Sequence, residues 1–288
     1  MKIAVMADIH SNHIALTRCI AEAKQNGAEE FIFLGDYLGE MAYPQRTLAI
    51  LQELKETYPC TFIRGNKEDY WIDHRDGKHG DWQWENGRSG SGMLRYAYDR
   101  LTPAQIEGFR EMPITRVMQY KDMPAFTICH GSPFRANQSL REDYDYIDEV
   151  TKKLETELTI CAHFHIQTQY TRNGKRVVNP GSVGVPLKSG GKAQFMMLCD
   201  EDGRWKTEFF SLDYDIDQVI REMEEEKLSI QAPVWCRVTQ AVLRGHNVTQ
   251  MAVLTKAVAL YEQFEGKTDW KNVPEKYWEM ALECLGGE

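Results

Sequence analysis

The 288-residue sequence lacks the features that would place it among membrane, nucleic-acid-wrapping or zinc-finger proteins. No apolar run approaches the ~20 residues that a membrane-spanning helix needs. Basic residues are in deficit, with 34 Lys and Arg against 43 Asp and Glu, and the formal charge of -9 repels long polyanions. None of the seven cysteines stands in a closely spaced pair of the kind that binds zinc. We therefore expect no membrane partner and no extended nucleic-acid partner.

The cysteines and the N-terminal residues favour a cytoplasmic protein. Cys60, Cys129, Cys161 and Cys199 lie within apolar runs, which favours reduced core residues over a disulfide framework. The first apolar run ends at Asp8, so we expect a β-strand there rather than a secretory signal. With 42% hydrophobic residues, the chain can bury a substantial core.

The first part of the sequence alternates between short apolar runs and segments with helical periodicity. We expect strands at 3–7, 31–34 and 61–63 and helices at 13–26 and 44–58. This order predicts parallel βαβ units. Residues 67–113 interrupt it with a segment rich in Trp, Tyr, Asp and Gly, which we interpret as a helical cap inserted between core strands.

Strands return after the insertion, and the last part of the chain is helical. We expect strands at 114–119, 125–129 and 158–161, an acidic helix at 143–156, and hairpins at 167–178 and 193–211. A charged amphipathic helix should begin at about residue 213, followed by helices at 234–245, 247–264 and 274–285. The first hairpin has the Asn-Gly turn that most strongly predicts such a structure. We therefore predict an α/β domain at 1–212 and a helical C-terminal extension at 213–288.

Seven side chains of metal-binding type follow five of the expected strands. They are Asp8, His10, Asp36, Asn66, His130, His163 and His165. The two pairs spaced by two residues project from the same side of an extended chain, and ligands collect beyond the carboxyl ends of strands in open α/β sheets. Each signal alone is weak, because a strand-end Asp or His is commonly a turn or hydrogen-bonded residue. Together the seven predict a metal site.

The order of these motifs resembles the calcineurin-like metallophosphoesterase superfamily. The matching segments are Asp8-Ile9-His10, Gly35-Asp36, Gly65-Asn66-Lys67-Glu68, His130-Gly131 and Ala162-His163-Phe164-His165. The resemblance covers about residues 1–212 and includes NPGSVG at 179–184. It implies an α/β fold of four layers, in which two stacked mixed β-sheets are flanked by helices.

The resemblance also implies a dinuclear centre. Asp8, His10 and His165 would bind one ion, Asn66, His130 and His163 the other, and Asp36 both. Imidazole, carboxylate and amide ligands without thiolate fit two divalent or trivalent transition-metal ions, with Mn and Fe favoured and Zn and Ni as alternatives. Two divalent ions on two anionic ligands leave a formal surplus of about +2, which attracts phosphoryl oxygens.

The implied reaction is hydrolysis of a phosphodiester or nucleotide phosphoanhydride by a metal-bridging hydroxide. Asp36, Asn66 and His130 would be catalytic, and the last two would also contact the substrate. Lys67 stands where many family members have a histidine that is thought to protonate the leaving group. An ordinary lysine pKa of ~10.4 makes it a poor acid. Two interpretations of Lys67 stay open: a catalytic cation that holds the phosphate, and an exposed turn lysine.

The substrate is a small phosphorylated molecule in our interpretation, such as a nucleotide, because the layout also resembles bacterial phosphodiesterases and diadenosine tetraphosphate hydrolases. Arg135 is a candidate substrate contact, and His74 and His79 are candidate acids from the cap. The cap aromatics either stack on a nucleobase or form the core of the cap. They are Tyr70, Trp71, Trp82, Trp84 and Tyr96.

Other functions remain alternatives at this point. A phosphoprotein phosphatase of the same superfamily would need an open groove, whereas the insertion suggests a covered site. A non-catalytic scaffold on the same fold would have lost ligands, yet every ligand position is filled. A DNA exonuclease is disfavoured by the charge of -9.

Overall fold

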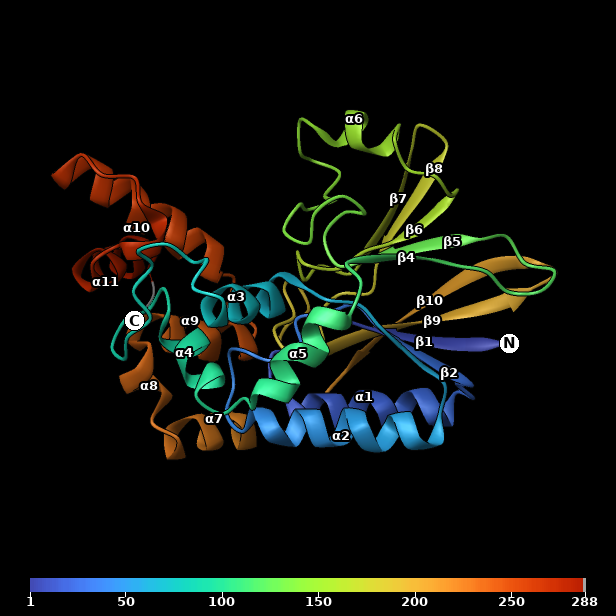
Figure 1. Cartoon of the computed structure of the whole chain (residues 1–288), viewed down its shortest axis with the longest axis horizontal. Helices are drawn as coiled ribbons and strands as arrows, with labels where there is room; N and C mark the ends of the chain where they lie inside the picture. The colour runs from blue at the N-terminus through green and yellow to red at the C-terminus, as the bar shows by residue number, and fades with distance from the viewer. Residues whose placement is uncertain (287–288) are drawn as a thin grey trace.

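Two five-stranded β-sheets pack face to face in the computed structural model, which describes residues 1–286 (Figure 1). The first sheet has the order β10-β9-β1-β2-β3, with β1, β2 and β3 parallel and β9 antiparallel to both of its neighbours. Its strands are β1 (Lys2–Met6), β2 (Glu30–Phe33), β3 (Cys60–Phe62), β9 (Ala193–Glu201) and β10 (Arg204–Leu212). The expected βαβ units are therefore confirmed.

The second sheet has the order β4-β5-β6-β8-β7. Its central strands β5, β6 and β8 are parallel, and the outer strands β4 and β7 are antiparallel to their neighbours. Its strands are β4 (Thr115–Met118), β5 (Phe126–Cys129), β6 (Leu158–Ile160), β7 (Thr168–Arg172) and β8 (Lys175–Asn179). Both predicted hairpins are present, and Asn173 and Gly174 adopt the positive φ angles that their tight turn requires.

Helices form the outer layers of this sandwich. The helices α1 (His13–Gln25) and α2 (Pro44–Thr57) cover the first sheet, and α6 (Ile147–Thr151) lies over the second (Figure 1). The Asn12 side chain accepts a hydrogen bond from the Ala15 amide and caps α1, while Pro44 occupies the first turn of α2. The chain thus has the four-layer α/β architecture of two mixed sheets flanked by helices.

The two faces of β1 show why its residues are almost all apolar. Ile3 and Val5 pack between the sheets together with Phe126, whereas Ala4 and Met6 point to the helix side. These four β1 side chains are fully buried, whereas Lys2 at the start of β1 is exposed. A strand that is covered on both faces needs an unbroken apolar run rather than an alternating one.

The acidic helix expected at 143–156 was too long. Only Ile147–Thr151 is helical, and the flanking residues form turns. Five acidic residues between positions 142 and 149 repel one another in a helix, and aspartate is a weak helix former. Arg141 instead pairs with Asp143 two residues away, which a helical surface does not allow.

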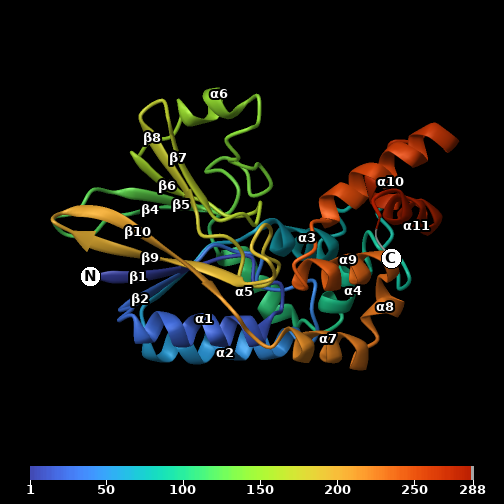
Figure 2. The same ribbon diagram turned by 180° about the vertical axis from the view of Figure 1, so that it is seen from behind.

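Helices from the insertion and from the C-terminal extension lie together at one end of the sandwich (Figures 1 and 2). The insertion contains α3 (Asn66–Arg75), α4 (Gly92–Tyr98) and α5 (Pro103–Glu111). The extension contains α7 (Ile216–Glu225), α8 (Leu228–Gln231), α9 (Pro233–Leu243), α10 (Gln250–Glu265), the 3-10 turn η1 (Trp270–Asn272) and α11 (Glu275–Cys284). The domain boundaries at 67–113 and 212 stay predictions.

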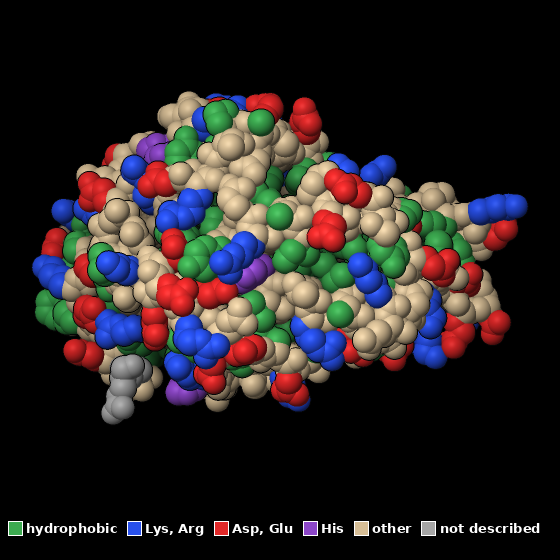
Figure 3. Space-filling model, turned by 90° about the horizontal axis from the view of Figure 1, so that it is seen from below, with side chains coloured by type: hydrophobic (Ala, Val, Ile, Leu, Met, Phe, Trp, Pro, Cys, Tyr) green, Lys and Arg blue, Asp and Glu red, His purple; other side chains and the backbone are tan. Residues whose placement is uncertain are grey.

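Figure 3 shows the face to which α1, α2 and α7 contribute, where acidic and basic side chains are interspersed. Contacts among His13, Arg46 and Glu222 join these three helices, with the Arg46 guanidinium 2.9 Å from the Glu222 carboxylate. Among the described residues, no helix combines the length and the apolar character that crossing a membrane requires.

Candidate metal centre

The seven predicted side chains come together where five strands end. They follow β1, β2, β3, β5 and β6, which belong to both sheets. Five of these residues have φ angles between 50° and 75°, namely Asp8, His10, Asp36, His163 and His165. Non-glycine residues rarely adopt this left-handed region, and such strain concentrates at functional sites. Tertiary contacts therefore hold these loops in a conformation that local preference does not favour.

Two glycines allow the loops after β2 and β3 to touch. A Cβ atom on Gly65 would lie 2.2 Å from the Asp36 Oδ1 atom, and one on Gly35, whose φ is +89°, would lie 2.4 Å from the Gly65 nitrogen. The Lys67 amide donates a 2.8 Å hydrogen bond to the same Asp36 oxygen. Only glycine fits at both positions, because a side chain at Gly65 would displace the Asp36 carboxylate and one at Gly35 would collide with the Gly65 backbone.

Asp8, His10 and His165 form the first part of the centre, which we call the His10 side. The Nε2 atoms of the two histidines face each other at 3.2 Å, and the His165 Nε2 atom lies 3.4 Å from the Asp8 Oδ1 atom. One donor atom from each of the three residues lies within 4.8 Å of the others. The arrangement can hold a metal ion.

Asn66, His130 and His163 form the second part, the Asn66 side. The Asn66 Oδ1 and His130 Nε2 atoms are 3.0 Å apart, and the His163 and His130 rings lie 5.3 Å apart between centroids. Asp36 faces both sides: its Oδ2 atom is 3.9 Å from His10 Nε2 and its Oδ1 atom is 3.5 Å from His130 Nε2. This is the position that a bridging carboxylate requires.

Backbone carbonyls fix the orientation of one histidine on each side. The His130 Nδ1 atom lies 2.6 Å from the Leu34 carbonyl oxygen, and the His165 Nδ1 atom lies 2.8 Å from that of Val185. Each Nδ1–H group donates to its carbonyl, so each Nε2 atom is left to face the centre. A ligating histidine usually has such a partner for its other ring nitrogen.

The centre attracts positive charge. Burial alone would lower the pKa of His130, but the carboxylates of Asp36 and Asp8 outweigh it and raise that pKa to about 10. Burial would raise the pKa of Asp36, yet His130 and His10 hold it well below its usual value. Burial and the nearby histidine His130 hold the pKa of His163 at about 4. The carboxylates that favour a proton on His130 would equally favour a metal cation.

The residues present fit a transition-metal pair. The Asp8 Oδ1 atom is buried and accepts no hydrogen bond from the described residues, which is costly for a carboxylate unless a cation is bound. The donor set is imidazole, carboxylate and amide, without thiolate, and this suits Mn, Fe, Zn or Ni. The Asp8 carboxylate is completely buried, so water from the bulk cannot replace the missing partner.

Lys67 is not an exposed turn lysine. Its Nζ atom lies 2.6 Å from the Glu40 Oε1 atom, and its side chain is only 13% exposed. Burial alone would lower the pKa of Lys67, but Glu40 and Asp36 outweigh it and raise the pKa above its usual value. Lys67 is therefore a cation beside the centre and a poor proton donor. Arg135 follows His130 on a loop and its side chain is exposed.

The cap aromatics belong to the hydrophobic core of the molecule rather than to an open platform. Trp71, Trp82, Trp84 and Tyr96 are at most 5% exposed. His74 stacks on Trp84 with 4.0 Å between ring centroids. Trp82 makes edge-to-face contacts with Tyr70 and with Trp84, so these rings pack on one another, and Tyr70 is half-buried.

His79 also packs in this aromatic cluster, 4.6 Å from the His74 ring. Neither histidine lies in the groups of side chains that could hold a metal. The interpretation of these two residues as acids supplied to the centre therefore has no geometric support.

Two buried glutamates at the centre were not predicted to have a role. Glu68 accepts hydrogen bonds from the backbone amides of Asp36, Tyr37 and Gly65 at 2.8–3.0 Å and so ties two ligand loops together. Glu40 lies beside His10, with 3.6 Å between its Oε1 atom and the His10 Nδ1 atom. Glu68 could have been found from the sequence, because it is part of the motif Gly65-Asn66-Lys67-Glu68. Glu40 belongs to no motif.

Comparisons with known proteins agree with this geometry. The calcineurin-like phosphoesterase superfamily domain matches residues 1–203. An uncharacterised protein of Methanocaldococcus jannaschii is 23% identical over 248 residues, which span 81% of this chain and 94% of that protein.

Solved structures share the fold. The crystal structure of a hypothetical protein from Pyrococcus horikoshii OT3 matches with a TM-score of 0.68 and 23% identity, over 86% of this chain and 99% of that one. A metallophosphoesterase from Sphaerobacter thermophilus matches with a TM-score of 0.65 and 18% identity, over 82% of this chain and 98% of that one.

Proposed function

Because the chain belongs to the calcineurin-like phosphoesterase superfamily and is therefore a metal-dependent hydrolase of phosphoesters, we propose that it uses two metal ions to cleave a phosphodiester or a nucleotide phosphoanhydride. The observation that carries this proposal is the Asp36 carboxylate, whose two oxygens face His10 and His130 on opposite sides of the centre. Two bound ions at such a site would supply positive charge and an activated water for in-line attack on phosphorus.

The protein's own side chains would bind and orient the phosphoryl group. Asn66 and His130, whose Oδ1 and Nε2 atoms are 3.0 Å apart at the centre, would contact a phosphoryl oxygen. The Lys67 ammonium, held by Glu40 beside the centre, would add a positive charge for the phosphoryl group. Arg135 is long and exposed on the loop after His130, so it is our candidate for a more distant phosphate.

The state of Lys67 supports a substrate with a good leaving group. Its pKa lies above the usual value because the neighbouring carboxylates outweigh its burial, so it keeps its proton at neutral pH. A phosphoanhydride or an activated diester departs with little proton assistance, whereas an alkyl phosphomonoester needs an acid. We therefore rank anhydrides and diesters above monoesters, and propose a small phosphorylated substrate in the cytoplasm.

A substrate panel combined with elemental analysis tests the proposal. The purified protein is analysed for Mn, Fe, Zn and Ni and then assayed on a nitrophenyl diester, a nitrophenyl monoester, diadenosine tetraphosphate and a phosphoserine peptide. We expect two metal equivalents and faster turnover of the diester or the tetraphosphate. A preference for the phosphopeptide would favour the phosphoprotein phosphatase alternative instead.

A further inference from the structure

A buried carboxylate outside the seven predicted residues lies against the centre. Glu40 is 3% exposed, and both of its oxygens have partners. Its Oε1 atom is 2.6 Å from the Lys67 Nζ atom and 3.6 Å from the His10 Nδ1 atom, and its Oε2 atom accepts a 2.6 Å hydrogen bond from the Trp235 indole. The carboxylate therefore has a defined orientation beside His10.

The His10 ring lacks the backbone carbonyl that orients His130 and His165. Its Nδ1 atom is buried and makes no hydrogen bond among the described residues, and Glu40 is the carboxylate that faces it. Gly39 allows this close approach, because its φ is +141° and a Cβ atom there would lie 3.2 Å from His10 Nδ1. The 3.6 Å separation of the His10 Nδ1 and Glu40 Oε1 atoms is only slightly longer than a hydrogen bond.

The partner of Glu40 comes from the C-terminal extension. Trp235 lies in the first turn of α9, 195 residues away from Glu40 in the sequence. The Ser89 hydroxyl of the insertion accepts hydrogen bonds from the amides of Val234 and Trp235 and donates one to the Glu275 carboxylate. The insertion thus fixes where α9 begins, and with it the position of the indole.

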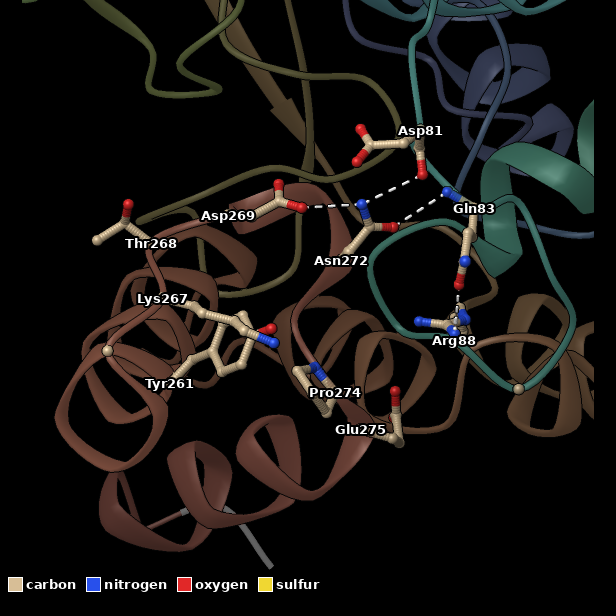
Figure 4. Close-up of a pocket in the computed structure, with 12 residues that line it drawn as sticks. Asp81, Gln83, Arg88, Tyr261, Lys267, Thr268, Asp269, Asn272, Pro274 and Glu275 are labelled. Carbon is tan, nitrogen blue, oxygen red and sulfur yellow. Dashed lines mark hydrogen bonds between the residues drawn. The ribbon is translucent and has the colours of Figure 1, made fainter.

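The contact between insertion and extension continues beyond Ser89. Around a polar cavity of about 890 Å³, the Asn272 side chain donates to the Asp81 carbonyl and accepts from the Gln83 amide (Figure 4). None of the seven predicted metal ligands lines this cavity. Asn272 of the extension is thus bonded to the insertion at the edge of this cavity.

We propose that Glu40 and Trp235 are positioning residues of the metal centre: Trp235 orients Glu40, and Glu40 holds the His10 imidazole with its Nε2 atom toward the metal. The proposal rests on the proposed dinuclear function and adds that the extension completes the His10 side. Carboxylates that accept from a ligating histidine orient its ring and raise its basicity, and their loss typically weakens metal binding 10–100-fold.

Metal titration of matched tryptophan variants tests this role. Trp235→Phe removes the indole N–H but keeps an aromatic ring, and Trp205→Phe is the control because its buried indole donates to the Pro124 carbonyl between the sheets. Each metal-depleted protein is titrated with Mn²⁺ by calorimetry and with Co²⁺ by visible absorption. We expect Trp235→Phe to weaken one of two metal equivalents about tenfold and to change the Co²⁺ spectrum, while Trp205→Phe matches the wild type.

Glu40→Gln gives a second test that preserves side-chain volume. We expect it to weaken the same single equivalent by about 10–100-fold, without a change at the other. If both variants bind two equivalents as tightly as the wild type, with the same Co²⁺ spectrum, the positioning role is wrong although the dinuclear function stands. If the wild type itself binds no metal and cleaves no phosphoester, the proposed function is wrong as well.

Discussion

The two sides of the centre are built from different supports. On the Asn66 side, the His130 imidazole is held by the carbonyl of Leu34 at the end of β2, and Asn66 begins α3. On the His10 side, the ring of His10 faces the Glu40 carboxylate, whose indole partner belongs to the extension. On the Asn66 side, a backbone carbonyl of the β-sandwich is thus the group that orients His130. On the His10 side, the side chains of Glu40 and Trp235 also take part, and Trp235 belongs to the C-terminal extension. The first arrangement tolerates changes outside the sandwich better than the second.

Asp36→Asn should have the largest effect, because it should weaken metal binding on both sides of the centre. The carboxylate faces His10 and His130, and an amide neutralises one of only two anionic ligands. We expect loss of both metal equivalents and a fall in kcat of about 10³-fold or more. Elemental analysis and the diester assay measure both effects. The exposed Asp213 offers the control variant Asp213→Asn, and retention of two metals by Asp36→Asn would contradict the bridging role.

Gly65→Ala should damage the Asn66 side first. The added methyl group would overlap the Asp36 Oδ1 atom, which lies 2.2 Å from the Cβ position, so the carboxylate must move. We expect metal affinity to fall by about 100-fold or more, in line with the upper end of effects of supporting residues. Calorimetric Mn²⁺ titration measures the change.

Gly108→Ala is the matched control for that substitution. Gly108 lies inside α5, and a Cβ atom there would meet nothing within 4 Å. Alanine should stabilise the fold by about 0.5–1 kcal/mol, because glycine loses more conformational freedom in a helix. Equal metal affinities of the two alanine variants would show that the contact between Gly65 and Asp36 is unimportant.

The histidine pKa values predict that metal binding on the Asn66 side depends on pH. Burial opposes the charged form, but Asp36 and Asp8 raise the pKa of His130 to about 10, so a metal must displace a proton below that pH. Affinity should therefore rise as pH increases, by up to about tenfold per pH unit between pH 6 and 8. His163, with a pKa of about 4, does not compete in this range. Calorimetry in buffers of different ionisation enthalpy counts the released proton, and a flat profile would contradict the prediction.

Lys67→Ala should have the smallest effect of these substitutions on metal binding and turnover. Both sides keep their ligands, so two metal equivalents should remain bound. Turnover should fall by roughly tenfold, less than the ~10²–10³ expected for a dedicated transition-state donor, because the ammonium is shared with Glu40. Steady-state kinetics on the best substrate measure the loss. Wild-type kcat would contradict a catalytic role of Lys67.

Much of the fold could be predicted because strands, helices and tight turns each have a local sequence pattern. The unbroken apolar run of β1 and the Asn173-Gly174 turn were both read correctly from the sequence. The helix at 143–156 was predicted too long, since like charges and turn pairing compete there with helical periodicity. The role of the cap aromatics was also left open, because composition does not tell whether a ring such as Trp84 is covered by its neighbours.

The sequence by itself determined which residues gather at the centre. Parallel strands end at one edge of a sheet, so side chains placed after successive strands must meet, wherever they stand in the chain. Only the tertiary structure decided that Glu40 faces the His10 ring and that the Lys67 ammonium pairs with Glu40 beside the centre. Glu40 and Trp235 belong to no periodic pattern, and they meet because the insertion fixes the start of α9 through Ser89. Periodicity specifies the face that a residue occupies, whereas the partner across a packed interface is decided only when the whole chain has folded.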